Sequence, residues 1–190
     1  MKNILIIYFL FILNCFFLSA QNDSIKVLWT ASEWDPVSRT YFDNIELNKN
    51  YFESINDAEK AIVGLFAFMH GNECMWDSGF RKPDRSNLKC ILNSALSLGY
   101  QCSDIQMSFL KNWFRDDTVT MNKFKKCPTI SLTSTIQDMI DEMYLTRLKD
   151  EIIVSLTITE MNILTDKNVT RRETHKFLLQ NKCIFEITGH

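Results

Sequence analysis

The sequence predicts an α+β fold in which N-terminal helices pack on a C-terminal curved antiparallel β-meander, and two observations lead to it. Apolar and mostly hydroxylated side chains alternate from Ile152 to Thr159, which is the period of a strand with one buried face. Upstream, between residues 57 and 114, apolar residues recur at helical spacing instead. Helices followed by a run of strands are typical of α+β domains, whereas a parallel sheet would need strands and helices in alternation.

The three clearest strands are expected at residues 151–163, 169–179 and 183–188. Each of the first two runs ends in a short polar segment, at 166–168 and at 181–182. These segments have the residue types of tight turns, so consecutive strands should pair antiparallel as a meander.

The alternation also assigns the two faces of the first of these strands. A slip of one residue would exchange the faces, so the assignment can be tested residue by residue. Ser155 and Thr157 should lie outside the core. The side chains expected inside it are Ile152, Val154, Leu156 and Ile158.

Three helices are expected before the sheet. The first spans Asp57–His70 and has Asn56 as its capping residue, and the second spans Asn87–Leu98. Ser103 should cap the third, which should end near Asp117 because negative charge is unfavourable at a helix C-terminus. Residues 118–133 then form a connector of mixed character. Residues 134–148 show helical spacing followed by an extended pattern, so a helical start and an extended end are expected there.

The N-terminus has the organisation of a secretory signal peptide, residues 1–20. A positively charged start precedes an apolar run from Ile4 to Leu18, and Ser19-Ala20 comes just before a polar segment. A membrane anchor is the alternative, but about 15 apolar residues are short for a bilayer span of roughly 20. Lipid attachment at Cys15 is a further alternative, although the apolar run continues past it. The mature protein is therefore expected to be exported, and to be periplasmic or secreted.

The rest of the chain divides into an aromatic-rich N-terminal arm, residues 21–53, and a single α+β domain, residues 54–190. The arm holds too many aromatic side chains for a free tail, so it should pack on the domain, with one short helix at 41–47. Burial is the first expectation for these side chains, and a partner-binding aromatic patch is the alternative. They are Trp29, Trp34, Tyr41, Phe42, Tyr51 and Phe52.

Charge argues against some partner classes. The chain has 190 residues, with 21 basic and 23 acidic side chains and a formal net charge of −2. The two signs are interspersed, and no basic stripe is present that would neutralise phosphates, so nucleic acid is not an expected partner. After residue 20 no apolar stretch is long enough to cross a bilayer, so no membrane is expected as a partner after signal cleavage.

The mature chain would hold five cysteines, and export permits disulfide bonds. Cys183 alternates with Phe185 and Ile187, which places it in the core as a thiol. An odd count leaves at least one cysteine unpaired, and with Cys183 in the core four remain that could form bridges. They are Cys74, Cys90, Cys102 and Cys127.

Helix geometry narrows the pairing of these four cysteines. Nine residues of intact helix after Cys90 would rise about 13 Å, whereas a disulfide needs Cα atoms within roughly 7 Å. A Cys90–Cys102 bridge is therefore disfavoured. Two sets stay open: Cys74–Cys90 with Cys102–Cys127, or Cys74–Cys102 with Cys90–Cys127. The absence of any bridge is the third outcome.

Two histidines are the candidate chemical groups. His70 lies within eight residues of Glu73, Cys74 and Asp77, but the spacing matches no metal-ligand pattern, so a histidine at a helix end and a disulfide cysteine are expected there rather than a metal site or a nucleophile pair. His175 is the candidate catalytic acid or base, because strand alternation places it on one face with Phe177 and Leu179. Glu173 lies two residues away on the same face, but the sequence assigns His175 no carboxylate partner. A half-buried histidine near a strand end is the alternative. No cofactor and no metal are expected.

The segment from Phe177 to Ile187 resembles the closing hairpin of nuclear transport factor 2-like (cystatin-like) domains, in which a strand ending in a polar turn is followed by a short aromatic-bearing strand. The resemblance covers residues 135–188. The tryptophan usual in that last strand is replaced here by Cys183 or Phe185. The resemblance implies a curved sheet wrapped over helices with a cone-shaped pocket, a fold that hosts enzymes, binders and oligomer scaffolds alike.

Three functions follow as hypotheses. The first is an exported, non-enzymatic domain that binds an unknown protein or small-molecule ligand, for instance as a periplasmic immunity or inhibitor-like protein. The second is a pocket enzyme with His175 as its acid or base. The third is a structural or oligomerisation module, such as a homodimer. An inward-facing His175 beside a second polar group would favour the enzyme, and a filled apolar core would count against it.

Overall fold

The computed structural model describes residues 24–187 except positions 38, 71–87, 129–135, 163 and 166. The side chains at positions 42, 136 and 137 are also left out of the description. The predicted signal peptide, residues 1–20, therefore lies outside the described residues, and so does Cys74.

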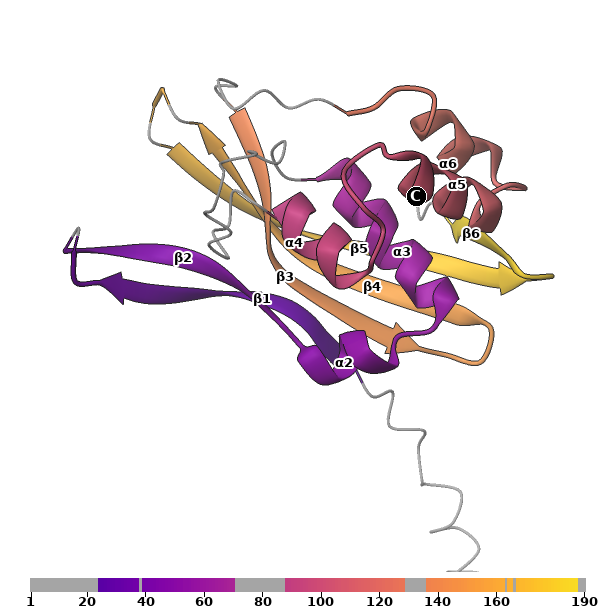
Figure 1. Cartoon of the computed structure of the whole chain (residues 1–190), viewed down its shortest axis with the longest axis horizontal. Coiled ribbons are helices and arrows are strands. Elements are labelled where there is room, and N and C mark those ends of the chain that lie inside the picture. The colour runs from indigo at the N-terminus through magenta and orange to yellow at the C-terminus, as the bar shows by residue number, and fades with distance from the viewer. Residues whose placement is uncertain are drawn as a thin grey trace, which may run out of the picture.

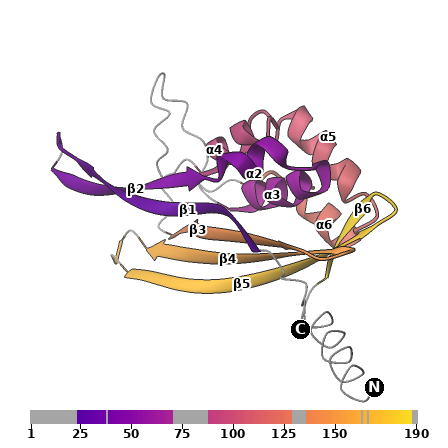
Figure 2. The same cartoon turned by 90° about the horizontal axis from the view of Figure 1, so that it is seen from below.

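Six antiparallel strands form one sheet in the order β2-β1-β3-β4-β5-β6. The sheet is curved, and the helices lie on one of its faces (Figures 1 and 2). The predicted α+β class and the curved antiparallel sheet are thus confirmed. The strands are β1 (Ser24–Asp35), β2 (Thr40–Leu47), β3 (Ile136–Arg147), β4 (Glu151–Asn162), β5 (Lys167–Gln180) and β6 (Cys183–Ile187).

The described helices all lie between β2 and β3 in the sequence. Asn56 and Ser103 cap two of them as predicted, because each side chain accepts a hydrogen bond from the backbone N–H three residues further on. Asp117, expected at the end of a helix, instead caps the next one through the backbone N–H groups of Val119 and Thr120. The predicted connector 118–133 therefore begins with a helix. The helices are α2 (Lys49–Ser54), α3 (Asp57–Met69), α4 (Leu88–Ala95), α5 (Asp104–Trp113) and α6 (Thr118–Lys123).

The core lies between α3 and the inner face of the sheet. Every residue of α3 from 61 to 68 is buried, since sheet and helices enclose this helix. Gly64 allows close packing, because a Cβ built there would lie 2.9 Å from Leu98 Cδ1 and 3.3 Å from Leu110 Cδ2. On β4 the predicted faces are confirmed: Ser155 and Thr157 are partly exposed. The inward side chains, none more than 5% exposed, are Ile152, Val154, Leu156 and Ile158.

The N-terminal segment differs from the prediction. Residues 24–47 form the β1–β2 hairpin, so the short helix expected at 41–47 is instead strand β2. The base of the hairpin belongs to the sheet, because β1 pairs with β3 from Ser24 to Trp29. In the described residues, β1 beyond Trp29 pairs with β2 alone, and this distal half projects past the other strands and the helices (Figures 1 and 2).

Strand β3 occupies 136–147, where a helical start was expected. A β-bulge between Ile140 and Glu142 explains the error. The extra residue shifts the alternation by one, so the buried side chains of Ile140 and Met143 are three residues apart instead of two. Three-residue spacing is a helical signal when it is seen in a sequence alone.

Candidate functional site

His175 lies on the inner face of β5, opposite Val154 of β4. Its side chain is 20% exposed. The ring meets Phe66 of α3 edge to face, with centroids 5.0 Å apart, and stacks on Phe177 at 6.5 Å. The histidine therefore points into the fold, where its strand position indicated that it should lie.

Both ring nitrogens of His175 contact carboxylates. Nδ1 lies 3.0 Å from Oε1 of Glu186 on β6, and Nε2 lies 3.2 Å from Oε2 of Glu173, which is on β5 like His175 itself. Sequence reasoning identified Glu173 as a same-face neighbour but missed Glu186. The two-residue turn at 181–182 was the available signal, because it sets Glu186 opposite Phe177 and so on the face of His175.

The histidine is the centre of a row of alternating charges across the sheet. On one side Lys123 Nζ of α6 lies 2.6 Å from Oε2 of Glu186. On the other side Arg171 Nε lies 2.7 Å from Oε1 of Glu173, and its NH2 group lies 2.9 Å from Oδ2 of Asp138. The row connects α6, β6, β5 and β3, so it ties the edge of the sheet to its centre.

These contacts set the protonation of the site. The hydrogen bond to Glu186 raises the pKa of His175 above its ordinary value, and Glu173 adds to the rise. In turn the hydrogen bond from His175 lowers the pKa of Glu186 to about 2. A protonated ring with both N–H groups donated to carboxylates keeps neither a lone pair for accepting a proton nor an N–H for a further acceptor.

His70 follows the last residue of α3 and is also buried, at 9% exposure. Its ring stacks on Phe66 with centroids 6.2 Å apart, and burial lowers its pKa, which favours the neutral form. Nε2 has no hydrogen-bond partner among the described residues. Glu73, Cys74 and Asp77 lie outside the described residues. In the described part of the chain, no three His, Cys, Asp or Glu side chains are grouped so that they could hold a metal ion.

The disulfide between Cys102 and Cys127 decides between the two predicted sets. The Cα atoms are 6.0 Å apart. This bridge excludes the pairing of Cys102 with Cys74 and belongs to the set that joins Cys74 to Cys90. Cys90 is also disulfide-bonded, and Cys74, its predicted partner, lies outside the described residues. Cys183 is a free, buried thiol, as predicted.

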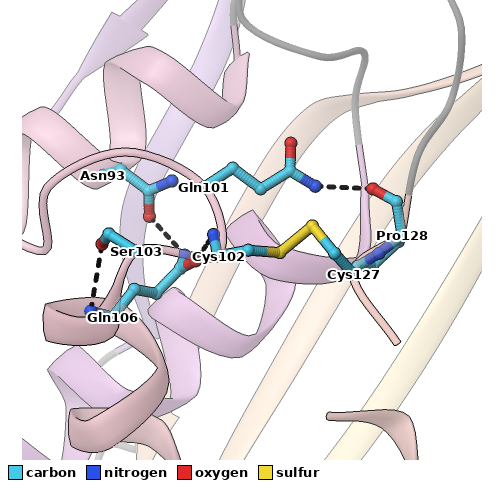
Figure 3. Close-up of a disulfide and its surroundings, with 7 residues drawn as sticks. All are labelled: Asn93, Gln101, Cys102, Ser103, Gln106, Cys127 and Pro128. Carbon is cyan, nitrogen blue, oxygen red and sulfur yellow. Dashed lines mark hydrogen bonds between the residues drawn. A yellow bond between two sulfur atoms is a disulfide. The ribbon is translucent and has the colours of Figure 1, made fainter. Parts of the chain in front are cut away.

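Hydrogen bonds hold the chain on both sides of this bridge (Figure 3). The backbone N–H of Cys102 donates to Oε1 of Gln106 at 2.7 Å, and the amide of Gln106 donates to Oδ1 of Asn93 at 2.8 Å. Gln101 donates to the carbonyl of Pro128 at 2.6 Å. The bridge therefore fastens the corner between α4 and α5 to the segment that follows α6.

The second candidate site is the tip of the β1–β2 hairpin. Trp34 and Tyr41 are directly opposite each other on the two strands, and their rings meet edge to face with centroids 5.1 Å apart. They are 48% and 72% exposed, and Val37 in the connecting turn is 90% exposed. The expectation that the aromatic side chains of this region are buried holds for Tyr51, at 4%, and is wrong for the pair at the tip.

Comparison with protein-family models, with curated proteins and with solved structures finds no match for this chain. The resemblance to nuclear transport factor 2-like domains therefore stays a prediction. None of the helices in the described ranges combines the length and the apolar character that crossing a bilayer requires.

Proposed function

We propose that this protein is an exported, non-enzymatic domain that binds a partner protein through the tip of its β1–β2 hairpin, as an immunity or inhibitor-like protein would. The observation that carries the proposal is the exposed Trp34–Tyr41 pair on the part of the hairpin that projects past the sheet. The predicted signal peptide supports export.

Aromatic pairs of this kind suit a binding surface. Tryptophan and tyrosine are enriched in the centres of protein interfaces, and they lose little conformational entropy on binding because each has only two side-chain torsions. Trp34, Val37 and Tyr41 come together at one place. Elsewhere in the described residues, the exposed large apolar side chains lie on separate elements, which is ordinary for a protein surface. These are Tyr100, Ile105, Val119, Leu164, Val169 and Ile187.

A pocket enzyme with His175 as its acid or base is the second candidate. Its inward orientation and its polar neighbours are features of such a site. The contacts weigh against it, because both ring nitrogens already face carboxylates and one of these, Glu186, also binds Lys123. A substrate would have to displace a charged partner before it reached the ring. Nitrogen NMR of the ring tests this: a catalytic base should titrate near neutral pH, whereas a ring held by two carboxylates should stay doubly protonated above it.

Photo-crosslinking from the hairpin tests the binding proposal. A photoreactive phenylalanine analogue placed at position 34 or 41 is expected to capture one defined protein from the envelope of living cells of the source organism. The matched control is the same analogue at Tyr100, which is 61% exposed and lies between α4 and α5. Equal capture from position 100, or no capture from positions 34 and 41, would contradict the proposal.

A further inference from the structure

We infer that the partner presents a lysine or arginine side chain to the Trp34–Tyr41 pair, so that the hairpin tip recognises a cationic protein surface. The inference rests on the proposed function and specifies the chemistry of the partner. It comes from an arrangement that the protein already uses at the base of the same hairpin.

At the base, one ammonium group is held by two aromatic rings and a carboxylate. Lys26 Nζ lies 5.5 Å from the ring centroid of Trp29 and 5.4 Å from that of Tyr144, and it forms a 2.8 Å ion pair with Oε1 of Glu142. Trp29 and Lys26 come from β1, and the other two residues come from β3. A tryptophan, a tyrosine and a carboxylate on neighbouring strands therefore bind a cation in this protein.

The tip repeats this set of groups. Trp34 and Tyr41 face each other across the hairpin, and Asp43 lies two residues from Tyr41, on the same face. Ser32, opposite Asp43, donates a 2.6 Å hydrogen bond to its Oδ1 and so orients the carboxylate. Over the described residues, the cation–ring contacts are at Trp29, Tyr144 and Phe109. The rings at the tip carry none.

The charge of the hairpin favours a cationic occupant. Beyond the Trp29–Glu46 pair the hairpin carries three carboxylates and one guanidinium, that of Arg39. Its negative potential attracts basic side chains, and arginine is among the residues enriched in protein interfaces. The same charge opposes an anionic membrane surface, and it also opposes the same hairpin of a second copy, because like charges would meet. The carboxylates are those of Glu33, Asp35 and Asp43.

A peptide titration tests the chemistry without knowledge of the partner. The probe is a capped glycine–arginine peptide, and its control is the same peptide with citrulline, which keeps the shape and removes the charge. The indole N–H signal of Trp34, assigned by its loss in Trp34→Phe, should shift saturably with the arginine peptide, while that of Trp113 on α5 should not move. Asp43→Asn should weaken binding about threefold to tenfold, whereas Glu33→Gln, which removes a carboxylate from the opposite face of the hairpin, is the matched control and should weaken it less. No shift at millimolar peptide, or an equal shift with citrulline, would overturn the inference.

Crosslinking in cells separates this inference from the proposed function. Capture from position 34 that falls in Asp43→Asn more than in Glu33→Gln supports both. Capture that is unchanged in Asp43→Asn, or that yields a second copy of this chain, overturns the cationic partner while leaving the hairpin as a contact surface. Absence of capture contradicts the proposed function, and the peptide titration then decides the inference alone. Unchanged circular dichroism melts of the variants show that the fold is intact.

Discussion

Strand β4 and the distal half of the β1–β2 hairpin present their apolar side chains to opposite environments. In β4 these side chains face α3 and are at most 5% exposed, so their burial drives folding. In the hairpin, Trp34 and Tyr41 face solvent although both are large. The comparison indicates that the body of the sheet is built for stability, whereas the tip of the hairpin contributes to something other than folding. Four measurements test this contrast.

The largest effect is expected in the body. Leu156→Ala should lower the free energy of unfolding by about 2–5 kcal/mol, because it opens a cavity in the core beside α3. Thr157→Ala is the matched control on the opposite face of the same strand and should cost less than about 1 kcal/mol. Denaturant melts measure both. Equal losses would reject the assigned faces and with them the contrast.

The second-largest loss in the free energy of unfolding is expected when the disulfide is removed. The double variant Cys102→Ser with Cys127→Ser should lose about 2–4 kcal/mol, because the bridge restricts the unfolded chain over a separation of 25 residues. Thermal melts under non-reducing conditions measure the loss, and Cys183→Ala, which removes a thiol without removing a bridge, is the control. Peptide mapping of the native protein should yield a Cys102–Cys127 linked peptide; a Cys90–Cys102 peptide would contradict the structure.

The row of charges around His175 should contribute a smaller and pH-dependent amount to the free energy of unfolding. The folded-state pKa of His175 is raised above 6.5, so its contribution is complete below pH 6.5 and is lost as the pH rises through that raised value. His175→Gln should therefore cost about 1–2 kcal/mol near pH 6 and clearly less near pH 9.

Buried His70 acts in the opposite direction, because its pKa is lowered and the fold must keep it neutral as the pH falls below 6.5. Both the variant and the wild type retain His70, so their difference at each pH isolates His175. Melts across this pH range provide the measurement. A difference that grows with pH would show that the ring is neutral in the fold.

The smallest effect on stability is expected at the tip. Trp34→Ala and Tyr41→Ala should each change the free energy of unfolding by less than about 1 kcal/mol. Each should nevertheless abolish partner capture by the photoreactive analogue at the other of these two positions. Tyr51→Ala is the control from the same aromatic-rich segment. Because Tyr51 is only 4% exposed, its loss should cost about 3 kcal/mol or more. A Trp34→Ala variant as unstable as Tyr51→Ala would mean that the tip serves folding after all.

Local signals explain which parts of the fold could be predicted from the sequence. The caps at Asn56 and Ser103 and the alternation of β4 depend on residues close together in the chain, and they were predicted correctly. The hairpin depends on distant partners: β1 needs β3 as its neighbour, and a bulge between Lys26 and Leu28 leaves Val27 and Leu28 both buried, which hides the strand period. Two bulges in paired strands therefore removed the pattern that identifies them.

For the site around His175, too, only the contacts within β5 and between β5 and β6 could be predicted from the sequence. Glu173 was visible as a same-face neighbour of His175, and Glu186 follows from the length of the turn between β5 and β6. Lys123 and Asp138 come from α6 and β3, and no local pattern links those elements to β5. The exposure of the aromatic pair at the tip could not be predicted either, because the residue type alone does not show whether an aromatic side chain is buried or exposed.

The pairing of β1 with β3 has a consequence for the order of assembly. Lys26 and Glu142, which form an ion pair at this junction, are 116 residues apart. At a synthesis rate of roughly 5–20 residues per second, this part of β1 precedes its partner in β3 by about 6–23 seconds. A two-stranded ribbon is marginally stable alone. We therefore expect β1 and β2 to stay without a stable neighbouring strand, and their aromatic side chains to stay exposed, while the helices form. Strands β3 to β6 pair with their neighbours in the sequence and can form the meander without β1. We therefore expect β1, although it is synthesised first, to pair with the edge of β3 last.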